Sequence, residues 1–211
     1  MLSICVFASG RGSNMQALLD AIDAGHVDAR VVLVISNKSA AGALETATAR
    51  GIPAVHTSDT HFTSESSYID HLLRLLQEHH CDFIVLAGYL KKIPAAIIQR
   101  FSQRIINIHP ALLPSFGGKG LYGHHVHEAV LAYGCKVSGA TVHLVDLEYD
   151  TGAPILQKCV PVLEGDTPDT LAERVLKVEH EILPLAVQLF AEQRVTIQGH
   201  RAIITANGNR P

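Results

Sequence analysis

The sequence contains no tryptophan, few other aromatic residues and no long apolar run. Its longest uninterrupted apolar stretches fill only a β-strand, well short of the ~20 residues that a membrane-spanning helix needs. Aromatic residues make up 5% of the 211 residues, so we expect a core of valine, isoleucine, leucine and alanine. The apolar stretch 2–8 follows no positively charged residue and runs into a glycine-rich loop. It is therefore predicted to be a first β-strand and not a signal peptide.

The sequence also has few cysteines and a small net charge. The four cysteines lie far apart without a C-x-x-C pair, which favours reduced thiols in a cytoplasmic protein over a disulfide framework. The 13 histidines show no H-E-x-x-H spacing, so no metal site is predicted. The formal net charge of −3 is too weak a field for binding a nucleic-acid backbone. A composition of 47% hydrophobic and 18% charged residues is typical of a globular domain.

Short β-branched runs alternate with longer amphipathic stretches, which is typical of βαβ units around a parallel sheet. We expect strands over 4–8, 29–35, 53–56, 83–87, 105–108, 140–145, 155–160, 195–198 and 202–205. We expect helices over 14–24 and 41–50, from Ser64 or Ser66 to 79, from Pro94, over 126–133, and from Thr167 to 192 with an interruption or bend near Pro184.

These elements predict a single α/β domain with a Rossmann-like, doubly wound, mostly parallel sheet and helices on both faces. The domain is expected to span 1–205, with one half over about 1–100 and another over about 101–205, followed by a polar tail over 206–211.

The first candidate site is the loop Ser9-Gly10-Arg11-Gly12-Ser13-Asn14 between the first strand and the first helix. Glycines let backbone N–H groups face a ligand, and the helix N-terminus adds partial positive charge, so the loop predicts a phosphate site. A dinucleotide fingerprint would need a small residue in place of Met15 and an acid where Ser36 and Asn37 stand. The loop therefore fits one phosphate better than a pyrophosphate, and the alternative is a glycine-rich turn without a ligand.

Asn107 and His109 stand at the carboxyl end of a predicted strand, before a glycine-rich loop over 112–123. Residues i and i+2 of a strand project to the same face. An amide donor beside an imidazole can stabilise a carbonyl oxygen under attack and move a proton, which is the chemistry of formyl transfer. Asp150, in a turn between strands, would raise the pKa of His109 if it reached the ring, and would otherwise cap its own backbone. The alternative for His109 is a histidine satisfied within the core.

In an open parallel sheet, ligands bind at the carboxyl ends of the strands, where the strand order reverses. The loop 9–14, Gly88 and the pair of Asn107 and His109 all stand at such ends. We expect them to line one crevice that holds a small phosphorylated substrate.

Four motifs occur in a recognisable order: Ser9-Gly10-x-Gly12-Ser13-Asn14, Val85-Leu86-Ala87-Gly88-Tyr89, Asn107-Ile108-His109-Pro110-Ala111-Leu112-Leu113-Pro114, and Asp150-Thr151-Gly152. With these motifs, residues 1 to about 195 resemble the folate-dependent formyltransferase family, and within it the phosphoribosylglycinamide branch. The Asn-x-His-Pro-x-Leu-Leu-Pro run is shared by relatives that use 10-formyltetrahydrofolate. The phosphate loop is what narrows the assignment.

The resemblance implies direct transfer of the formyl group of 10-formyltetrahydrofolate to the amine of glycinamide ribonucleotide in purine synthesis, without a metal or a covalent enzyme intermediate. Asn107 and protonated His109 would stabilise the tetrahedral oxyanion, Asp150 would keep His109 cationic, and His143 would have a supporting role. The ribonucleotide would bind Arg11, Gly12, Ser13, Asn14, Gly88 and Glu179. The co-substrate folate would bind Leu90, Lys91, Lys92, Ile93, Asn107, Val145 and Asp146.

Two features depart from the family pattern. Glu65 stands where many relatives have an arginine that contacts the folate, and it would repel a glutamate tail. The loop 116–123 is longer and richer in glycine than in some relatives, and Lys119 or His124 could replace the lost positive contact.

Four alternatives remain open at this point. A formyltetrahydrofolate hydrolase would carry an N-terminal regulatory domain and a second histidine in place of Pro110, and a methionyl-tRNA formyltransferase would add a basic C-terminal domain. A non-catalytic nucleotide-binding module would use the phosphate loop alone. A nicotinamide oxidoreductase is disfavoured by Met15 and by the lack of an acid after the second strand. The partners are expected to be small molecules, with no nucleic acid or membrane, and a homodimer is allowed.

Overall fold

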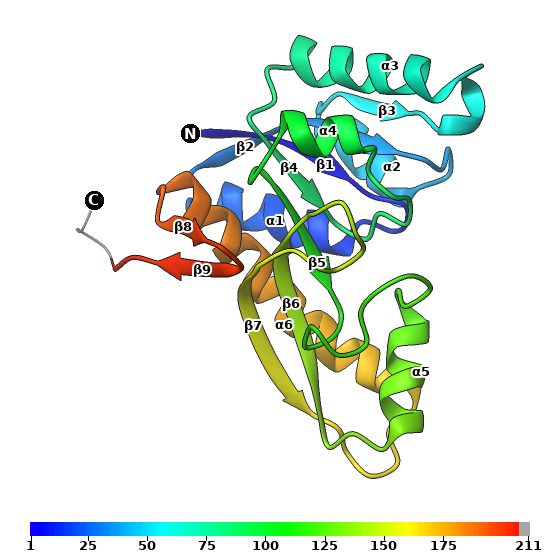
Figure 1. Cartoon of the computed structure of the whole chain (residues 1–211), viewed down its shortest axis with the longest axis vertical. Helices are drawn as coiled ribbons and strands as arrows, with labels where there is room; N and C mark the ends of the chain where they lie inside the picture. The colour runs from blue at the N-terminus through cyan, green and yellow to red at the C-terminus, as the bar shows by residue number, and fades with distance from the viewer. Residues whose placement is uncertain (207–211) are drawn as a thin grey trace. The chain divides into compact units, whose positions relative to one another are not determined.

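A computed structural model describes residues 1–206 of the chain (Figure 1). The chain forms two compact units. The first unit spans Met1–Ile106 and the second begins at Asn107. This division lies close to residue 100, where the two predicted halves meet. The single domain over 1–205 stays a prediction, and all of the predicted tail except Ala206 lies outside the described residues.

The main sheet has seven strands in the order β3-β2-β1-β4-β5-β6-β7. In the first unit, β1 (Leu2–Phe7) pairs in parallel with both β2 (Ala29–Ser36) and β4 (Phe83–Leu86), and β3 (Ala54–His56) pairs in parallel with β2. Residues 4–7 of β1 are completely buried, as the uninterrupted apolar run predicts for a strand that is covered on both faces. The predicted α/β class and the mostly parallel sheet are confirmed.

The helices of the first unit begin close to their predicted positions. α3 begins after Ser64, whose side chain accepts a hydrogen bond from the backbone N–H of Ser67, and this settles the choice between two predicted caps. Leu73 of α3 is half-buried, unlike its fully packed neighbours, because it lies at the edge of the apolar face. The helical elements are α1 (Ser13–Asp23), α2 (Gly42–Ala49), the 3₁₀ turn η1 (Asp59–His61), α3 (Glu65–Glu78) and α4 (Ala95–Arg100).

The second unit is built on an antiparallel pair, β6 (Val137–Leu144) and β7 (Pro154–Pro161), against which α6 (Pro168–Ala191) packs (Figure 1). α6 begins at a capping box of Thr167 and Thr170. It continues through Pro184 without an interruption, because packing of its apolar face outweighs the local cost of the proline. The alternative, a bend near Pro184, stays a prediction.

The remaining elements of the described chain complete the fold. β5 (Ile105–His109) runs across the division between the units, and its last residue is His109, one residue beyond the predicted strand end. α5 (His124–Tyr133) packs against α6. β8 (Val195–Gln198) and β9 (Arg201–Ile204) form a separate antiparallel hairpin.

The close contact of β6 with β7 generates a stability prediction. A Cβ added to Gly139 would lie 2.2 Å from the carbonyl oxygen of Lys158, so Gly139→Ala should lower the free energy of unfolding by about 1–3 kcal/mol. The neighbouring Ser138 is buried, and within residues 1–206 its hydroxyl has no hydrogen-bond partner. Ser138→Ala should therefore leave the free energy of unfolding within about 0.5 kcal/mol of wild type or raise it. Urea denaturation of both variants checks the contrast, and equal losses would contradict it.

Candidate functional site

The loop between β1 and α1, which is the predicted phosphate site, leads directly into the N-terminus of a helix. Gly12 adopts a left-handed conformation with φ of 82°, and a Cβ there would lie 2.9 Å from the Cα of Ala43 at the start of α2. Glycine is required at this position on both grounds. The first backbone bond of α1 runs from the N–H of Gln16 to the carbonyl of Gly12, so the preceding N–H groups form the positive end of the helix dipole.

Ser9 joins this loop to the ends of two neighbouring strands. Its hydroxyl donates to Oδ1 of Asn37 (2.6 Å) and accepts from the backbone N–H of Leu90 (2.9 Å). Its own backbone N–H donates to the carbonyl of Gly88 (3.0 Å). Ser9 is only 3% exposed. The sequence places it in the candidate loop, but nothing in the motif shows that its hydroxyl points to Asn37 and Leu90.

The other predicted binding residues of the first unit differ in exposure. Arg11 and Lys92 are exposed, whereas Asn14 and Ile93 are buried. Lys91 is exposed and forms an ion pair with Asp59 (3.3 Å). Gly12 and Ser13 are half-buried, and Gly88, Leu90 and Glu65 are exposed.

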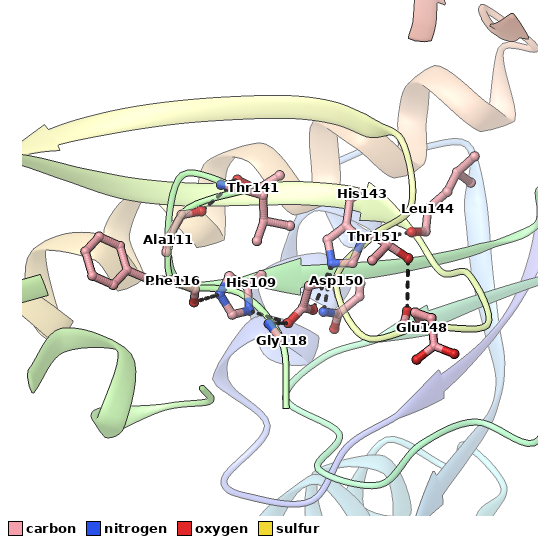
Figure 2. Close-up of polar contacts among 12 residues, drawn as sticks. His109, Ala111, Phe116, Gly118, Thr141, His143, Leu144, Glu148, Asp150 and Thr151 are labelled. Atoms are coloured by element: carbon pink, nitrogen blue, oxygen red, sulfur yellow. Dashed lines mark hydrogen bonds and ion pairs between the residues drawn. The ribbon is translucent and has the colours of Figure 1, made fainter. Parts of the chain in front are cut away.

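In the second unit, the predicted catalytic side chains converge on one carboxylate (Figure 2). Oδ2 of Asp150 lies 3.7 Å from Nδ1 of His109 at the end of β5, and Oδ1 lies 3.5 Å from Nε2 of His143 at the end of β6. Nδ2 of Asn107 lies 3.1 Å from the same Nε2. Both imidazoles are almost fully buried. The contact of Asp150 with His109, which spacing alone could not establish, is present.

Backbone groups fix the orientation of each ring and of the carboxylate. Nε2 of His109 lies 2.8 Å from the carbonyl of Phe116, and Nδ1 of His143 lies 2.8 Å from the carbonyl of Leu144 (Figure 2). A carbonyl oxygen can only accept, so each of these ring nitrogens carries a hydrogen. The backbone N–H of Gly118 donates to Oδ2 of Asp150 (2.8 Å). The glycine-rich loop 116–118 is thus fastened to both His109 and Asp150.

The turn that carries Asp150 has almost no free space around it. Asp150 adopts a left-handed conformation with φ of 57°, which aspartate tolerates better than most residues. A Cβ on Gly152 would lie 1.8 Å from the carbonyl oxygen of Leu144, and one on Gly117 would lie 3.2 Å from Cβ of Asp150. These glycines let the turn pack closely enough for the carboxylate to reach the two rings.

Thr141 holds the segment that follows His109. Its hydroxyl donates to the carbonyl of Ala111 (2.6 Å; Figure 2). It also accepts from the backbone N–H of Leu113 (3.1 Å), just before the cis Leu113–Pro114 bond. The side chain of Gln157 on β7 donates to both the carbonyl of Leu113 and the hydroxyl of Thr141. Sequence reasoning missed both residues, since a threonine and a glutamine within strands carry no positional signal.

Burial and charge oppose each other in this cluster. Burial lowers the pKa of His109 below its ordinary value, although the Asp150 charge and the Phe116 carbonyl raise it. Asp150 raises the pKa of His109, as the sequence predicts, but burial lowers that pKa by more. His109 is therefore less readily protonated than a free histidine. Burial raises the pKa of Asp150, yet hydrogen bonds from His143 and Gly118 and the two nearby imidazoles lower it overall.

The remaining predicted residues of the second unit lie outside this cluster of contacts. Val145 is half-buried, and Asp146 is exposed and accepts a hydrogen bond from the backbone N–H of Leu147. Glu179 is buried on α6. The crevice that would combine the loop 9–14 with Asn107 and His109 stays a prediction.

Residues 1–206 contain neither a metal-binding cluster nor a membrane-spanning helix. No group of three or more histidine, cysteine, aspartate or glutamate side chains in residues 1–206 is arranged to hold a metal ion. No helix in that range combines the length and apolar character needed to cross a bilayer.

Comparison with known proteins gives consistent matches. The formyl transferase family model matches residues 2–187. The chloroplastic phosphoribosylglycinamide formyltransferase of Arabidopsis thaliana is 45% identical over 193 residues, which are 91% of this chain and 66% of that protein. The Escherichia coli phosphoribosylglycinamide formyltransferase is 37% identical over 95% of this chain and 92% of its own length. The chain thus spans about two thirds of the plant relative and nearly all of the bacterial one.

A solved structure has the same fold. Glycinamide ribonucleotide transformylase 1 from Symbiobacterium toebii superimposes with a TM-score of 0.92 and 41% sequence identity. The match covers 98% of this chain and 95% of that one.

His127 on α5 generates a pH prediction. Burial, with smaller effects of His124 and His109, lowers its pKa from 6.5 to about 4. Between these two values the unfolded chain binds one more proton at this residue than the folded chain, so acidification lowers the free energy of unfolding. His127→Leu should make that loss shallower by about 1.4 kcal/mol per pH unit. Urea denaturation at several pH values measures the slope. The same change at the exposed His125 is the control, and equal slopes for the two variants would contradict the assignment.

Proposed function

The chain belongs to the formyl transferase family, and we propose on that premise that it transfers a formyl group from 10-formyltetrahydrofolate to the amine of glycinamide ribonucleotide, a step of purine biosynthesis. The observation that carries the proposal is the cluster in which Asp150 faces the buried rings of His109 and His143 beside Asn107. An amide donor, an imidazole and a carboxylate in contact are the groups that formyl transfer between two small molecules requires.

We assign the binding of the ribonucleotide phosphate to the loop before α1. The left-handed Gly12 and the N-terminus of α1 favour an anion there, and the exposed Arg11 adds a charge-assisted contact. The ribose and glycinamide are assigned to Gly88 and Glu179. The folate is assigned to Leu90, Lys91, Lys92, Ile93, Asn107, Val145 and Asp146.

In the proposed reaction the amine nitrogen attacks the formyl carbon, and its C–N bond forms before the bond from that carbon to N10 of the folate breaks. The carbonyl oxygen gains negative charge, which Asn107 stabilises through an amide N–H and His109 through a protonated ring nitrogen. The developing oxyanion raises the proton affinity of His109, which burial keeps low in the ligand-free protein. Asp150 stabilises the imidazolium, and the amine loses one proton while N10 of the departing folate gains one, so the transfer releases no net proton. A cytoplasmic location and a homodimer stay predictions.

The direct test is a spectrophotometric assay of the purified chain with 10-formyltetrahydrofolate and glycinamide ribonucleotide. Release of tetrahydrofolate that requires the ribonucleotide supports the proposal. Release at the same rate without the ribonucleotide would instead indicate a hydrolase, and no release in either mixture would indicate a nucleotide-binding module.

The catalytic assignment predicts large losses from small changes. His109→Ala and Asp150→Asn should each lower kcat by at least ~10², as the loss of a general acid or of the group that stabilises it does. Circular dichroism and urea denaturation should show folded proteins. His125→Ala, which removes an exposed histidine of α5, should leave kcat unchanged. Near-wild-type turnover in both cluster variants would refute the assignment.

The phosphate assignment predicts a selective loss of affinity. Arg11→Ala should raise the KM for the ribonucleotide about tenfold, the effect of one charge-assisted hydrogen bond, and should leave the KM for the folate unchanged. Arg74→Ala, which removes the same charge from an exposed position on α3, is the control. A parallel rise of both KM values in Arg11→Ala would show that the loop does not bind the phosphate specifically.

A further inference from the structure

Ser9, the first residue of the loop 9–14, is bonded to two other segments of the first unit. Its backbone N–H donates to the carbonyl of Gly88 (3.0 Å), and its hydroxyl accepts from the backbone N–H of Leu90 (2.9 Å). The same hydroxyl donates to Oδ1 of Asn37 (2.6 Å), directly after β2. Ser9 itself is buried. One residue therefore connects the loop before α1 with the segment that follows β4.

The hydrogen bonds of the Ser9 hydroxyl run in one direction. The hydroxyl carries a single hydrogen, which points to Asn37, so its oxygen is left to accept from Leu90. The N–H of Leu90 can only donate, and the side-chain oxygen of Asn37 can only accept. Consecutive bonds of this kind polarise one another, and burial strengthens them further. The Ser9 hydroxyl thus fixes the backbone direction at Leu90.

Tyr89, in the middle of the segment 88–90, is held by the same strand as Ser9. Its ring packs edge-to-face on Phe7 of β1, with ring centroids 5.2 Å apart and planes at 77°. Its hydroxyl lies 3.4 Å from the hydroxyl of the buried Tyr68 on α3. Because Phe7 and Ser9 are two residues apart, the end of β1 contacts every residue of the segment 88–90. The position of this segment therefore follows that of the end of β1.

On its other side Ser9 leads into the loop that we assign to the phosphate. The carbonyl of Gly10 accepts from the backbone N–H of Ala43 at the start of α2 (3.3 Å), so α2 supports the loop from one side. The first N–H groups of α1 have no partners within the helix, as at every helix start, and they can donate to an anion. An anion bound there would restrict the backbone of the loop and with it the orientation of Ser9.

We propose that Ser9 is a positioning residue that orders the segment 88–90 together with the loop 9–14, so that a ligand bound at either place favours binding at the other. The proposal rests on the function proposed above, which assigns the ribonucleotide phosphate to the loop and the folate to residues that begin at Leu90. Each ligand must restrict the backbone that it contacts, which opposes binding. Since Ser9 is bonded to both pieces of backbone, the first ligand already orders part of what the second one needs.

The first test is amide hydrogen exchange of the ¹⁵N-labelled full-length protein, with inorganic phosphate as the probe of the loop. We expect phosphate to shift the amide signal of Gly12 and to slow exchange at Leu90 about fivefold, the lower end of coupling between two sites. In Ser9→Ala the shift at Gly12 should remain, and the slowing at Leu90 should disappear.

The other outcomes of this test separate two failures. If phosphate shifts Gly12 and leaves exchange at Leu90 unchanged in the wild type, or slows it equally in Ser9→Ala, the proposal is overturned and the phosphate assignment stands. If phosphate does not shift Gly12 at all, the phosphate assignment is refuted and the coupling with it. Neither reading depends on turnover, so both are distinguishable from a failed formyl-transfer assay.

Steady-state kinetics test the same role in the reaction. Ser9→Ala should raise the KM for 10-formyltetrahydrofolate about fivefold to tenfold, the equivalent of one hydrogen bond, and should change kcat by a factor of about three at most. Arg11→Ala, in the same loop, is expected to raise only the KM for the ribonucleotide. A role of Ser9 in stability alone would lower the amount of folded protein and leave both KM values unchanged, and that result would refute positioning. Ser102→Ala, which removes an exposed hydroxyl of the first unit, is the control.

Asn37→Ala is a second variant that keeps the proposal testable if Ser9→Ala does not fold. It removes the acceptor of the Ser9 hydroxyl, and Asn37 is not assigned to either substrate. We expect a smaller rise in the KM for the folate, about threefold, because the bond to Leu90 remains and loses only the support of its neighbour. The double variant should be no worse than Ser9→Ala alone, because both changes break one chain of bonds. Additive rises, or an unchanged KM with unchanged exchange at Leu90 in Asn37→Ala, would contradict the proposal.

Discussion

The half-buried carboxylate of Asp150 is the constraint on which the candidate site depends. Removing a carboxylate from water is costly, and the cost is offset only when hydrogen bonds and nearby positive groups surround it. Here those groups come from the ends of β5 and β6 and from the loop 116–118. Three segments that are separate in the chain are therefore held in one arrangement, because each of them contributes to keeping this anion stable.

The dense packing around the turn explains why such an arrangement can be rigid. Gly152 and Gly117 allow backbone and side-chain approaches that a Cβ would prevent, and Thr141 with Gln157 fixes the segment after His109 from the opposite side. The orientation of each ring then follows from a backbone carbonyl, which does not titrate. Preorganisation of this kind lets an active site avoid spending binding energy on ordering its own groups.

The sequence predicted those features that depend on local periodicity. Alternating apolar runs located the strands, and the serine and threonine caps located α3 and α6. The two-residue spacing of Asn107 and His109 placed both on one face of β5. The sequence did not predict the contacts between residues that lie far apart in the chain. The reach of Asp150 to His109 crosses 41 residues (150 − 109), and Ser9, Thr141 and Gln157 are ordinary polar residues until their partners are known. The net pKa shift of His109 was also inaccessible, because it is the difference between burial and a nearby charge.

The bond from Ser9 to Asn37 has a consequence for the evolution and redesign of this fold. In dinucleotide-binding relatives of the doubly wound architecture, the residue that ends the second strand accepts hydrogen bonds from the ribose of the cofactor. In this chain the side-chain oxygen of Asn37 is engaged by Ser9, which in turn supports the backbone of Leu90. An acidic residue introduced at position 37 alone would therefore accept the hydrogen bond from Ser9 and would not be available to a ribose. A conversion to nicotinamide chemistry would have to release Ser9 first, and doing so would remove the bond from its hydroxyl to the backbone of Leu90.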